Sequence, residues 1–403
     1  MRILIANSIL GTEQHFVSDS NTGTCLWSSH IPKDVWVVGH PGHVMSIEAL
    51  GNVLGEKPIQ MFPDAHKKAF ETLCPEGLSS KIPWRWVLGD QEHRTRLKAV
   101  LESARFNVCA LEESNYKQTY IKIRKFLLEL NQPIIDLSKM NKYIQTNEKG
   151  QTVEASLRSF TPINGRAPKI IYDHAATATG RLTVKQGPRI LTLPARHRDI
   201  IAPESKCQIV QIDLVSAEPR TALYAAGKEP MGDIYKDIAN SLSLDIPRAS
   251  VKLAILSALY GASSSRLASI LGSKARSKRI IDRLRAHFGV GRIESQLHLE
   301  MKEKGYITNL FGRKLKTRRD EIQKAYSHFM QSTTSDAAIC MFSDMCEVLS
   351  QHDKQFKPLY VIHDALVCQV SSRLRHDLEK LSKRILLGGV GFYETKMTSV
   401  NDN

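Results

Sequence analysis

Two aspartates lie within apolar runs and have the chemistry needed to bind divalent metal ions. Asp213 belongs to the run QIVQIDLV (208–215), and Asp364 belongs to PLYVIHDALVCQV (358–370). Both runs are typical of buried strands, where a carboxylate is costly unless it is paired or bound to a metal. Brought together from adjacent strands, the two carboxylates could hold a pair of ions about 4 Å apart. Either aspartate alone could instead cap a turn or pair with an arginine.

A second group of polar residues follows helical spacing. Arg248 and Lys252 are four residues apart, and Tyr260 follows eight residues later in RASVKLAILSALYG (248–261). Residues at this spacing share one face of a helix. Two cations on one face can grip a triphosphate and neutralise the charge that develops on a leaving group. The alternative is an ordinary basic helix face.

The elements that must position these residues follow from the apolar pattern. The first 90 residues contain all four tryptophans, and their short apolar runs predict a small β-containing module. From about residue 91 to about residue 145, apolar residues recur at helical spacing. Beyond residue 151, the two strands that carry the aspartates alternate with long basic helices.

The positive charge of the chain is concentrated in one stretch. The formal net charge is +15, and residues 262–324 contain sixteen Lys or Arg against six Asp or Glu. Residues 1–90 contain seven basic and nine acidic side chains. A local excess of this kind is typical of a surface that follows a phosphate backbone. A solvated basic face without a partner is the alternative.

The composition predicts a protein of a cytosol-like compartment without a membrane partner. No apolar run is long enough to cross a bilayer, and the first residues lack the basic region of a secretory signal. The seven cysteines are scattered and show no metal-ligand spacing, which favours reduced thiols.

Four blocks of the sequence resemble, in order, the family A DNA polymerases, which include bacterial DNA polymerase I and its phage and mitochondrial relatives. The blocks are TATGRL (177–182), DLVSAEPR (213–220), RASVKLAILSALYG (248–261) and VIHDA (361–365), with GYITNLFGRK (305–314) and the pair Gln331 and Asp336 between them. The resemblance implies a template-directed DNA polymerase that adds deoxynucleotides to a primer 3′ end. It also implies a bacterial or phage-infected cytoplasm, with an organelle left open.

The implied fold is α+β, a right-hand polymerase fold with an antiparallel-sheet palm, helical fingers and a short helical thumb. We expect the N-terminal module over residues 1–90, the thumb over 91–150, the palm over 151–225 and 301–403, and the fingers over 226–300. A replisome partner could dock on residues 1–90. No two acidic residues in that segment lie two positions apart, so we expect no proofreading exonuclease.

The resemblance assigns the metal and nucleotide sites. Asp213, Asp364 and the backbone carbonyl of Leu214 are expected to bind two Mg²⁺ ions, for which Mn²⁺ can substitute. The dNTP-binding residues are expected to be Glu218, Arg248, Lys252, Leu256 and Tyr260, with Lys252 also acting in catalysis. Glu218 would exclude a ribose 2′-hydroxyl, and its alternative role is a surface ion pair with Arg220.

The resemblance also assigns contacts with primer-template DNA. Arg181 and Gln331 are expected at the minor-groove edge of the primer end, where all correct pairs present the same acceptors. His363 is expected to support the primer terminus, with a buried core histidine as the alternative. Arg313 is expected to bind phosphates together with the basic residues that follow it, Lys314, Lys316, Arg318 and Arg319.

Two departures from the family pattern bear on catalysis. Leu256 stands where the family usually has Phe or Tyr, and Ala365 stands where it usually has Glu. They leave a catalytically impaired, DNA-binding relative as an alternative. A single-subunit RNA polymerase is disfavoured by Glu218, and a metal phosphohydrolase would rest on the His363-Asp364 dipeptide alone.

Overall fold

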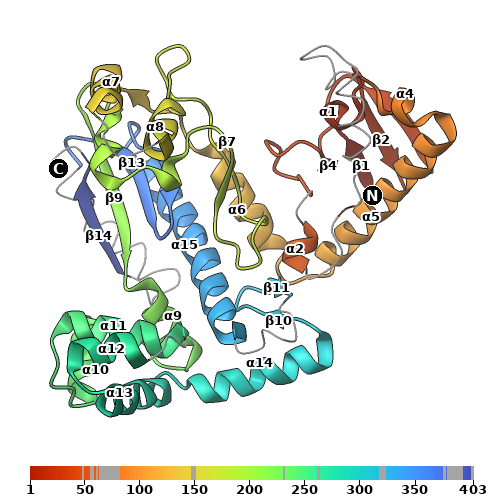
Figure 1. Cartoon of the computed structure of the whole chain (residues 1–403). Coiled ribbons are helices and arrows are strands. Elements are labelled where there is room, and N and C mark those ends of the chain that lie inside the picture. Colours follow the sequence, from red (N-terminus) through yellow and green to blue (C-terminus); the bar gives the residue numbers. More distant parts are fainter. Residues whose placement is uncertain are drawn as a thin grey trace. The chain divides into compact units, whose positions relative to one another are not determined.

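The computed structural model describes residues 1–47, 50–54, 59, 62, 82–146, 151–229, 232–260, 264–316, 324–374, 378 and 394–400. The chain divides into two compact units, which are described separately (Figure 1). Unit 1 comprises Met1–Leu128 with Gly312–Lys314, and unit 2 comprises Glu129–Phe311 with Leu315–Asn403. In the described part of the chain, no helix is both long and apolar enough to cross a bilayer.

Unit 1 begins with a four-stranded sheet, which is red in Figure 1. Its strands are β1 (Arg2–Ile5), β2 (His15–Asp19), β3 (Thr24–Ser28) and β4 (Trp36–Val38). Their order is β3-β2-β1-β4, with β1 antiparallel to β2 and parallel to β4. Leu4, Val17 and Val37 belong to its buried core. This sheet is the β-containing module expected in the first 90 residues.

The helices of unit 1 pack on this sheet and on each other. They are α1 (Asn7–Leu10), α2 (Leu50–Leu54), α4 (Trp84–Leu88), α5 (Asp90–Glu112) and α6 (Lys117–Glu129), whose last residue belongs to unit 2. Helix α5 buries Val100, Ala104 and Val108, which recur every four residues, and it contacts β1, α2 and α4. The helices expected as one thumb are therefore divided, because α7 (Leu137–Thr146) lies in unit 2. The boundary expected at residue 150 lies outside the described residues.

The main sheet of unit 2, called the central sheet below, is antiparallel, as expected for the palm. It contains β9 (Cys207–Val215), β12 (Lys357–Ile362), β13 (Ala365–Ser371) and β14 (Glu394–Ser399) in the order β12-β13-β9-β14. The single strand expected over 358–370 is wrong, because β12 and β13 form a hairpin. The turn is made by His363 and Asp364, and His363 adopts a left-handed φ of 57°.

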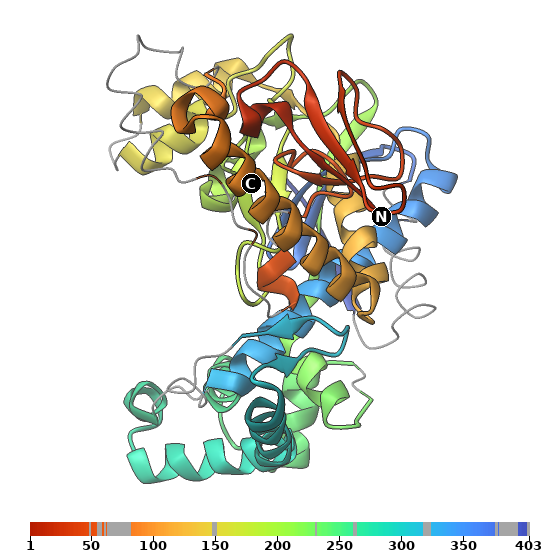
Figure 2. The same ribbon diagram turned by 90° about the vertical axis from the view of Figure 1, so that its right-hand side faces the viewer.

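Helices surround the central sheet and form a separate cluster at one end of unit 2. Besides α7, these helices are α8 (Gln151–Arg158), α9 (Ala217–Ala225), α10 (Ile234–Ser241), α11 (Arg248–Tyr260), α12 (Ser264–Leu271), α13 (Lys274–His287), α14 (Val290–Lys304) and α15 (Ala325–His352). The short elements are β5 (Ile134–Ile135), β6 (Ile171–Asp173), β7 (Thr183–Gln186), η2 (Ile190–Thr192), η3 (Ala195–Ile200), β8 (Ile201–Ala202), β10 (Ile307–Thr308) and β11 (Lys314–Leu315), whose first residue belongs to unit 1. Both views show α10 to α13 gathered together (Figures 1 and 2), where their apolar faces form one buried core.

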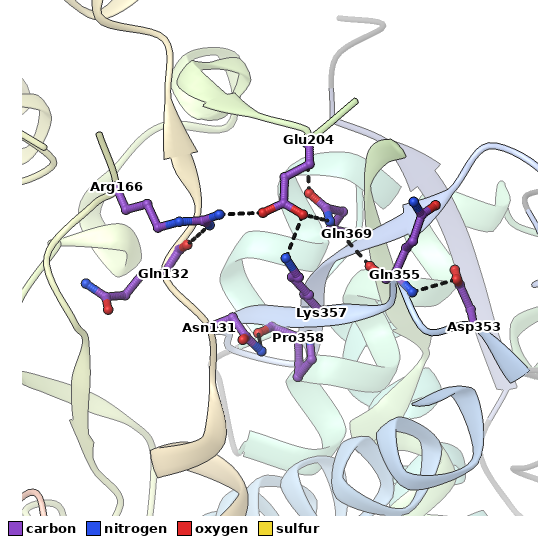
Figure 3. A network of polar contacts seen from close by, with 9 residues as sticks. All are labelled: Asn131, Gln132, Arg166, Glu204, Asp353, Gln355, Lys357, Pro358 and Gln369. Atoms are coloured by element: carbon purple, nitrogen blue, oxygen red, sulfur yellow. Dashed lines mark hydrogen bonds and ion pairs between the residues drawn. The ribbon is translucent and has the colours of Figure 1, made fainter. Parts of the chain in front are cut away.

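A polar network ties β9, β12 and β13 together (Figure 3). It lies at the ends of these strands opposite Asp213 and the hairpin turn. Glu204, just before β9, accepts hydrogen bonds from Lys357 on β12 at 2.6 Å and from Gln369 on β13 at 3.1 Å. Arg166 forms an ion pair with the other carboxylate oxygen. The Glu204 backbone N–H also donates to Gln369 Oε1 at 2.9 Å. One carboxylate therefore links both strands of the hairpin to the start of β9.

The network makes a prediction about stability and pH. Hydrogen bonds from Arg166, Lys357 and Gln369 lower the pKa of Glu204 from 4.5 to about 2. Because the pKa is lower in the folded state, this stabilisation is complete above about pH 4.5 and is lost as the pH falls toward 2. We expect Glu204→Gln to lower the free energy of unfolding by about 1–2 kcal/mol at pH 7, allowing for solvent screening. Urea denaturation from pH 3 to pH 7 measures the difference.

The matched control is Glu303→Gln, because Glu303 is exposed on α14. We expect the control to match the wild type across the same pH range. A difference for Glu204→Gln that stays constant between about pH 5 and pH 3 would contradict the assignment.

Candidate active site

Asp213 and Asp364 lie beside each other at one end of the central sheet. In the antiparallel ladder between β13 and β9, Ala365 lies opposite Asp213. Asp364 directly precedes Ala365, and its backbone carbonyl accepts a hydrogen bond from the Leu214 N–H at 3.0 Å. The two aspartates thus come from adjacent segments, as expected. Asp364 is exposed in the hairpin turn rather than placed within a strand.

The electrostatic surroundings of Asp213 favour a bound cation. Burial raises the pKa of the Asp213 carboxyl, a hydrogen bond from Gln211 opposes this rise, and the negative charge of Asp364 adds to it. The Asp213 and Asp364 carboxylates repel each other when both are ionised. A cation between them would remove this repulsion.

A cavity of about 400 Å³ opens beside Asp364. It is lined by Arg181, Leu182, Glu218, Gln331, Thr334, Ser335, Ala338, His363 and Asp364. Helix α15 supplies four of these residues, because Gln331, Thr334, Ser335 and Ala338 recur at helical spacing. His363 is exposed in the turn, so the alternative of a buried core histidine is wrong. The structure therefore gathers Arg181, Glu218, Gln331 and His363 around one cavity.

Glu218, in the first turn of α9, faces this cavity and not Arg220. Its Oε1 lies 3.5 Å from Nη2 of Arg181. Arg220 is buried, and it pairs instead with Glu394 at 3.0 Å. Burial and the nearby charge of Glu218 raise the pKa of Tyr260 well above its ordinary value. Glu218 and Tyr260 are thus electrostatic neighbours.

Helix α11 presents its polar stripe away from its buried side. Arg248 and Lys252 are exposed, and Leu256 and Tyr260 are half-buried on the same face. The opposite face packs into the core that α10 to α13 share. The cations predicted from the sequence are therefore available to a ligand.

Arg248 is held by two residues from the start of α10 that sequence reasoning missed. Its Nε lies 3.2 Å from Oδ2 of Asp233, and its guanidinium carbon lies 5.0 Å from the centre of the Tyr235 ring. Asp233 also caps α10 by accepting hydrogen bonds from the backbone N–H groups of Tyr235 and Lys236. The N-cap aspartate could have been recognised in the sequence, but its pairing with Arg248 depends on tertiary structure.

Arg313 does not have the exposure expected of a phosphate-binding residue. Its side chain is 0% exposed, and it packs within unit 1 against Tyr116, whose hydroxyl accepts a hydrogen bond from Nη2 at 2.9 Å. The guanidinium carbon also lies 5.1 Å from the centre of the Tyr116 ring. This burial argues against the expected DNA contact. Lys316 is exposed, whereas Arg318 and Arg319 lie outside the described residues.

Comparison with known proteins identifies the family. The family model described as DNA polymerase family A matches residues 95–390, which is well over half of the chain. The chain belongs to DNA polymerase family A. It is thus a DNA-directed DNA polymerase, and the single-subunit RNA polymerase and the phosphohydrolase are set aside.

The fold agrees with this assignment. The polymerase chain is similar to the POL domain of Pol1 from M. smegmatis, solved in complex with DNA primer-template and dNTP. The TM-score is 0.66 at 13% sequence identity, over 99% of this chain and 95% of that chain. At this identity the likeness shows the α+β polymerase fold alone. The curated proteins contain no match to the sequence.

The donor set of the polymerase fits divalent metal ions that are shared with a nucleotide. Among the described residues, no group of three or more His, Cys, Asp or Glu side chains could hold a metal ion by itself. Mg²⁺ binds through one or two carboxylates and completes its shell with water and substrate phosphate oxygens. Asp213 and Asp364 supply two such carboxylates. Burial and the nearby charge of Asp364 raise the pKa of Asp213, and a bound cation would favour its ionised form.

A buried tyrosine fixes the hairpin of the polymerase just before His363. Tyr172 on β6 donates a hydrogen bond from its hydroxyl to the Val361 carbonyl at 2.8 Å. The same hydroxyl accepts one from the Val361 N–H at 3.2 Å. Tyr360, the neighbour of Val361, is also buried, but its hydroxyl makes no hydrogen bond within the described residues.

These two tyrosines make a matched pair of test variants. Tyr172→Phe leaves two buried backbone groups without their partner, so we expect the free energy of unfolding to fall by about 1–3 kcal/mol. Tyr360→Phe removes an unpaired buried hydroxyl, so we expect a change of about 0.5 kcal/mol or less. Urea denaturation at pH 7 measures both. Equal losses in the two variants would refute the proposed role of the Tyr172 hydroxyl.

Proposed function

We propose that this polymerase extends a DNA primer by two-metal-ion nucleotidyl transfer at Asp213 and Asp364. The observation that carries the proposal is the register of β13 and β9, which places both carboxylates at one end of the central sheet. The carbonyl of Leu214, next to Asp213, would be a further ligand. Bound there, the ions would activate the primer 3′-hydroxyl and stabilise the leaving pyrophosphate.

The side chains of α11 would bind the triphosphate. Arg248 and Lys252 are exposed on one face, and the phosphate charge would attract both. Lys252 would also neutralise the charge that develops on the leaving group. Leu256 would contact the nucleotide without offering an aromatic ring, and Tyr260 would lie near the templating base. Arg248 would exchange its ion pair with Asp233 for the phosphates.

Primer-template DNA would lie along the cavity on the side of α15. Arg181 and Gln331 both line this cavity, and the minor groove offers each an acceptor common to every correct base pair. His363 would support the primer terminus from the hairpin turn. A partner protein on residues 1–90 stays a prediction; the exposed Leu26, Trp27 and Trp86 offer apolar contacts there.

The first experiment is primer extension with dNTPs and Mg²⁺. We expect Asp213→Asn and Asp364→Asn each to reduce extension by about a thousandfold or more, because lost metal binding costs several kcal/mol of transition-state stabilisation. Asparagine keeps the size of the side chain, so folding and primer-template binding should persist. Asp282→Asn, on the exposed face of α13, is the control with wild-type activity.

A wild-type protein that binds primer-template but does not extend it would support the alternative of an impaired, DNA-binding polymerase fold. The departures at Leu256 and Ala365 motivate that alternative. The same labelled primer, incubated without dNTPs, tests for proofreading. We propose that it stays intact, and steady shortening from the 3′ end would contradict this.

The second experiment concerns the sugar. Glu218 lies in the cavity wall, where its carboxylate would clash with a ribose 2′-hydroxyl. We expect Glu218→Ala to reduce discrimination against ribonucleotides by roughly 10- to 200-fold, which is the range for the loss of one steric contact. The ratio of kcat/KM for dNTP and NTP measures it. Glu303→Ala on α14 should keep the wild-type ratio, and an unchanged ratio in Glu218→Ala would refute the assignment.

A further inference from the structure

A chain of two hydrogen bonds leads from η3 to the Asp213 carboxylate. Gln211 lies on β9 two residues before Asp213, so the two side chains point to the same face of the strand. Gln211 Nε2 donates to Asp213 Oδ1 at 2.8 Å. Arg198 Nη1 in turn donates to Gln211 Oε1 at 3.0 Å. We propose that Arg198 and Gln211 are positioning residues that fix the Asp213 carboxylate for metal binding, an inference that rests on the proposed function.

The arginine determines which way the Gln211 amide points. A guanidinium only donates hydrogen bonds, so Gln211 has to turn its oxygen toward Arg198. The NH₂ group of the amide then faces Asp213, whose ionised carboxylate only accepts. Without Arg198, the Gln211 oxygen would lose this partner, and the side chain could turn away from the carboxylate. The orientation of Asp213 would then lose its support.

The neighbouring strands offer the Asp213 carboxylate no other side-chain hydrogen bond within the described residues, although the charge of Lys396 attracts it. Ala365 lies opposite it on β13 and has no polar side-chain group. Lys396 lies opposite it on β14, but no ion pair joins the two among the described residues. Among the described residues, Gln211 is thus the one whose side chain donates a hydrogen bond to the Asp213 carboxylate.

Arg198 is an unusual choice for a purely structural contact. Its side chain is half-buried, and its Nε is buried without a hydrogen-bond partner in the described part of the chain. A buried donor without an acceptor destabilises the fold. A role in the site accounts for the residue, whereas a structural bond between η3 and β9 is the alternative that the test must separate.

The test measures metal binding without turnover. Protein, a primer-template with a 3′-dideoxy end and the matching dNTP are titrated with Mn²⁺, and free Mn²⁺ is followed by electron paramagnetic resonance. We expect Gln211→Met and Arg198→Met each to weaken Mn²⁺ binding roughly tenfold, as is typical when the partner of a metal ligand is removed. The double variant should lose as much Mn²⁺ affinity as either single variant, because both residues act through one chain of hydrogen bonds.

Two further variants serve as references. Asp213→Asn shows the effect of losing the ligand itself. Thr398→Val is the matched control, because Thr398 is exposed on β14 opposite Gln211, and it should bind Mn²⁺ as the wild type does.

The outcomes that overturn the proposal are distinct. Wild-type Mn²⁺ affinity in either single variant overturns it, and with reduced stability in urea it assigns a structural role instead. The Mn²⁺ affinity of the double variant could instead fall by the product of the two single losses. The two residues would then act independently, and the proposed hydrogen-bond chain would be wrong. Primer extension by the wild type distinguishes failure of the positioning role from failure of the proposed function. If extension occurs and the variants bind Mn²⁺ normally, the positioning role fails and the proposed function stands.

Discussion

Ala365 lies opposite Asp213 in the ladder between β13 and β9, and this register determines which residues meet at the candidate active site. It places Asp364 next to the end of β9, where its carbonyl bonds to Leu214. A shift of one residue would turn every side chain of β13 to the other face and move the hairpin turn along the sheet. The cavity beside Asp364 would then lose the turn residues that line it.

The side chains of β13 specify this register poorly. All seven residues of the strand are buried, so no alternation of apolar and polar positions distinguishes one face from the other. Polar contacts supply the missing information. Gln369 on β13 bonds to Glu204 just before β9, and Tyr172 bonds to both backbone groups of Val361 on β12. The Gln369 bonds favour the observed register of β13 on β9, because a shift would separate the Gln369 amide from Glu204. The Tyr172 bonds fix β12, the partner of β13 in the hairpin.

Much of this framework could be predicted from the sequence, because local patterns encode it. The apolar run before Asp213 is β9, and the spacing of Arg248 and Lys252 predicts α11 and its exposed face. The hairpin turn was missed because His363 and Asp364 lack the Gly or Asn that usually marks such a turn. The burial of Arg313 against Tyr116 and the pairing of Arg248 with Asp233 were also missed. They join residues distant in sequence, and no local pattern reports them.

In the proposed mechanism, the charges of the candidate site are balanced only when nucleotide and metal ions are bound. The carboxylates come from the central sheet and its hairpin, and the cations come from α11, which packs on the other helices of its cluster. Without a nucleotide, Arg248 forms an ion pair with Asp233, and both side chains are substantially exposed. An exposed ion pair of this kind contributes about 0–1 kcal/mol, so a triphosphate can replace it at small cost. Nucleotide phosphates would neutralise the positive charge of α11. Metal ions bound to these phosphates would neutralise the negative charge of Asp213 and Asp364.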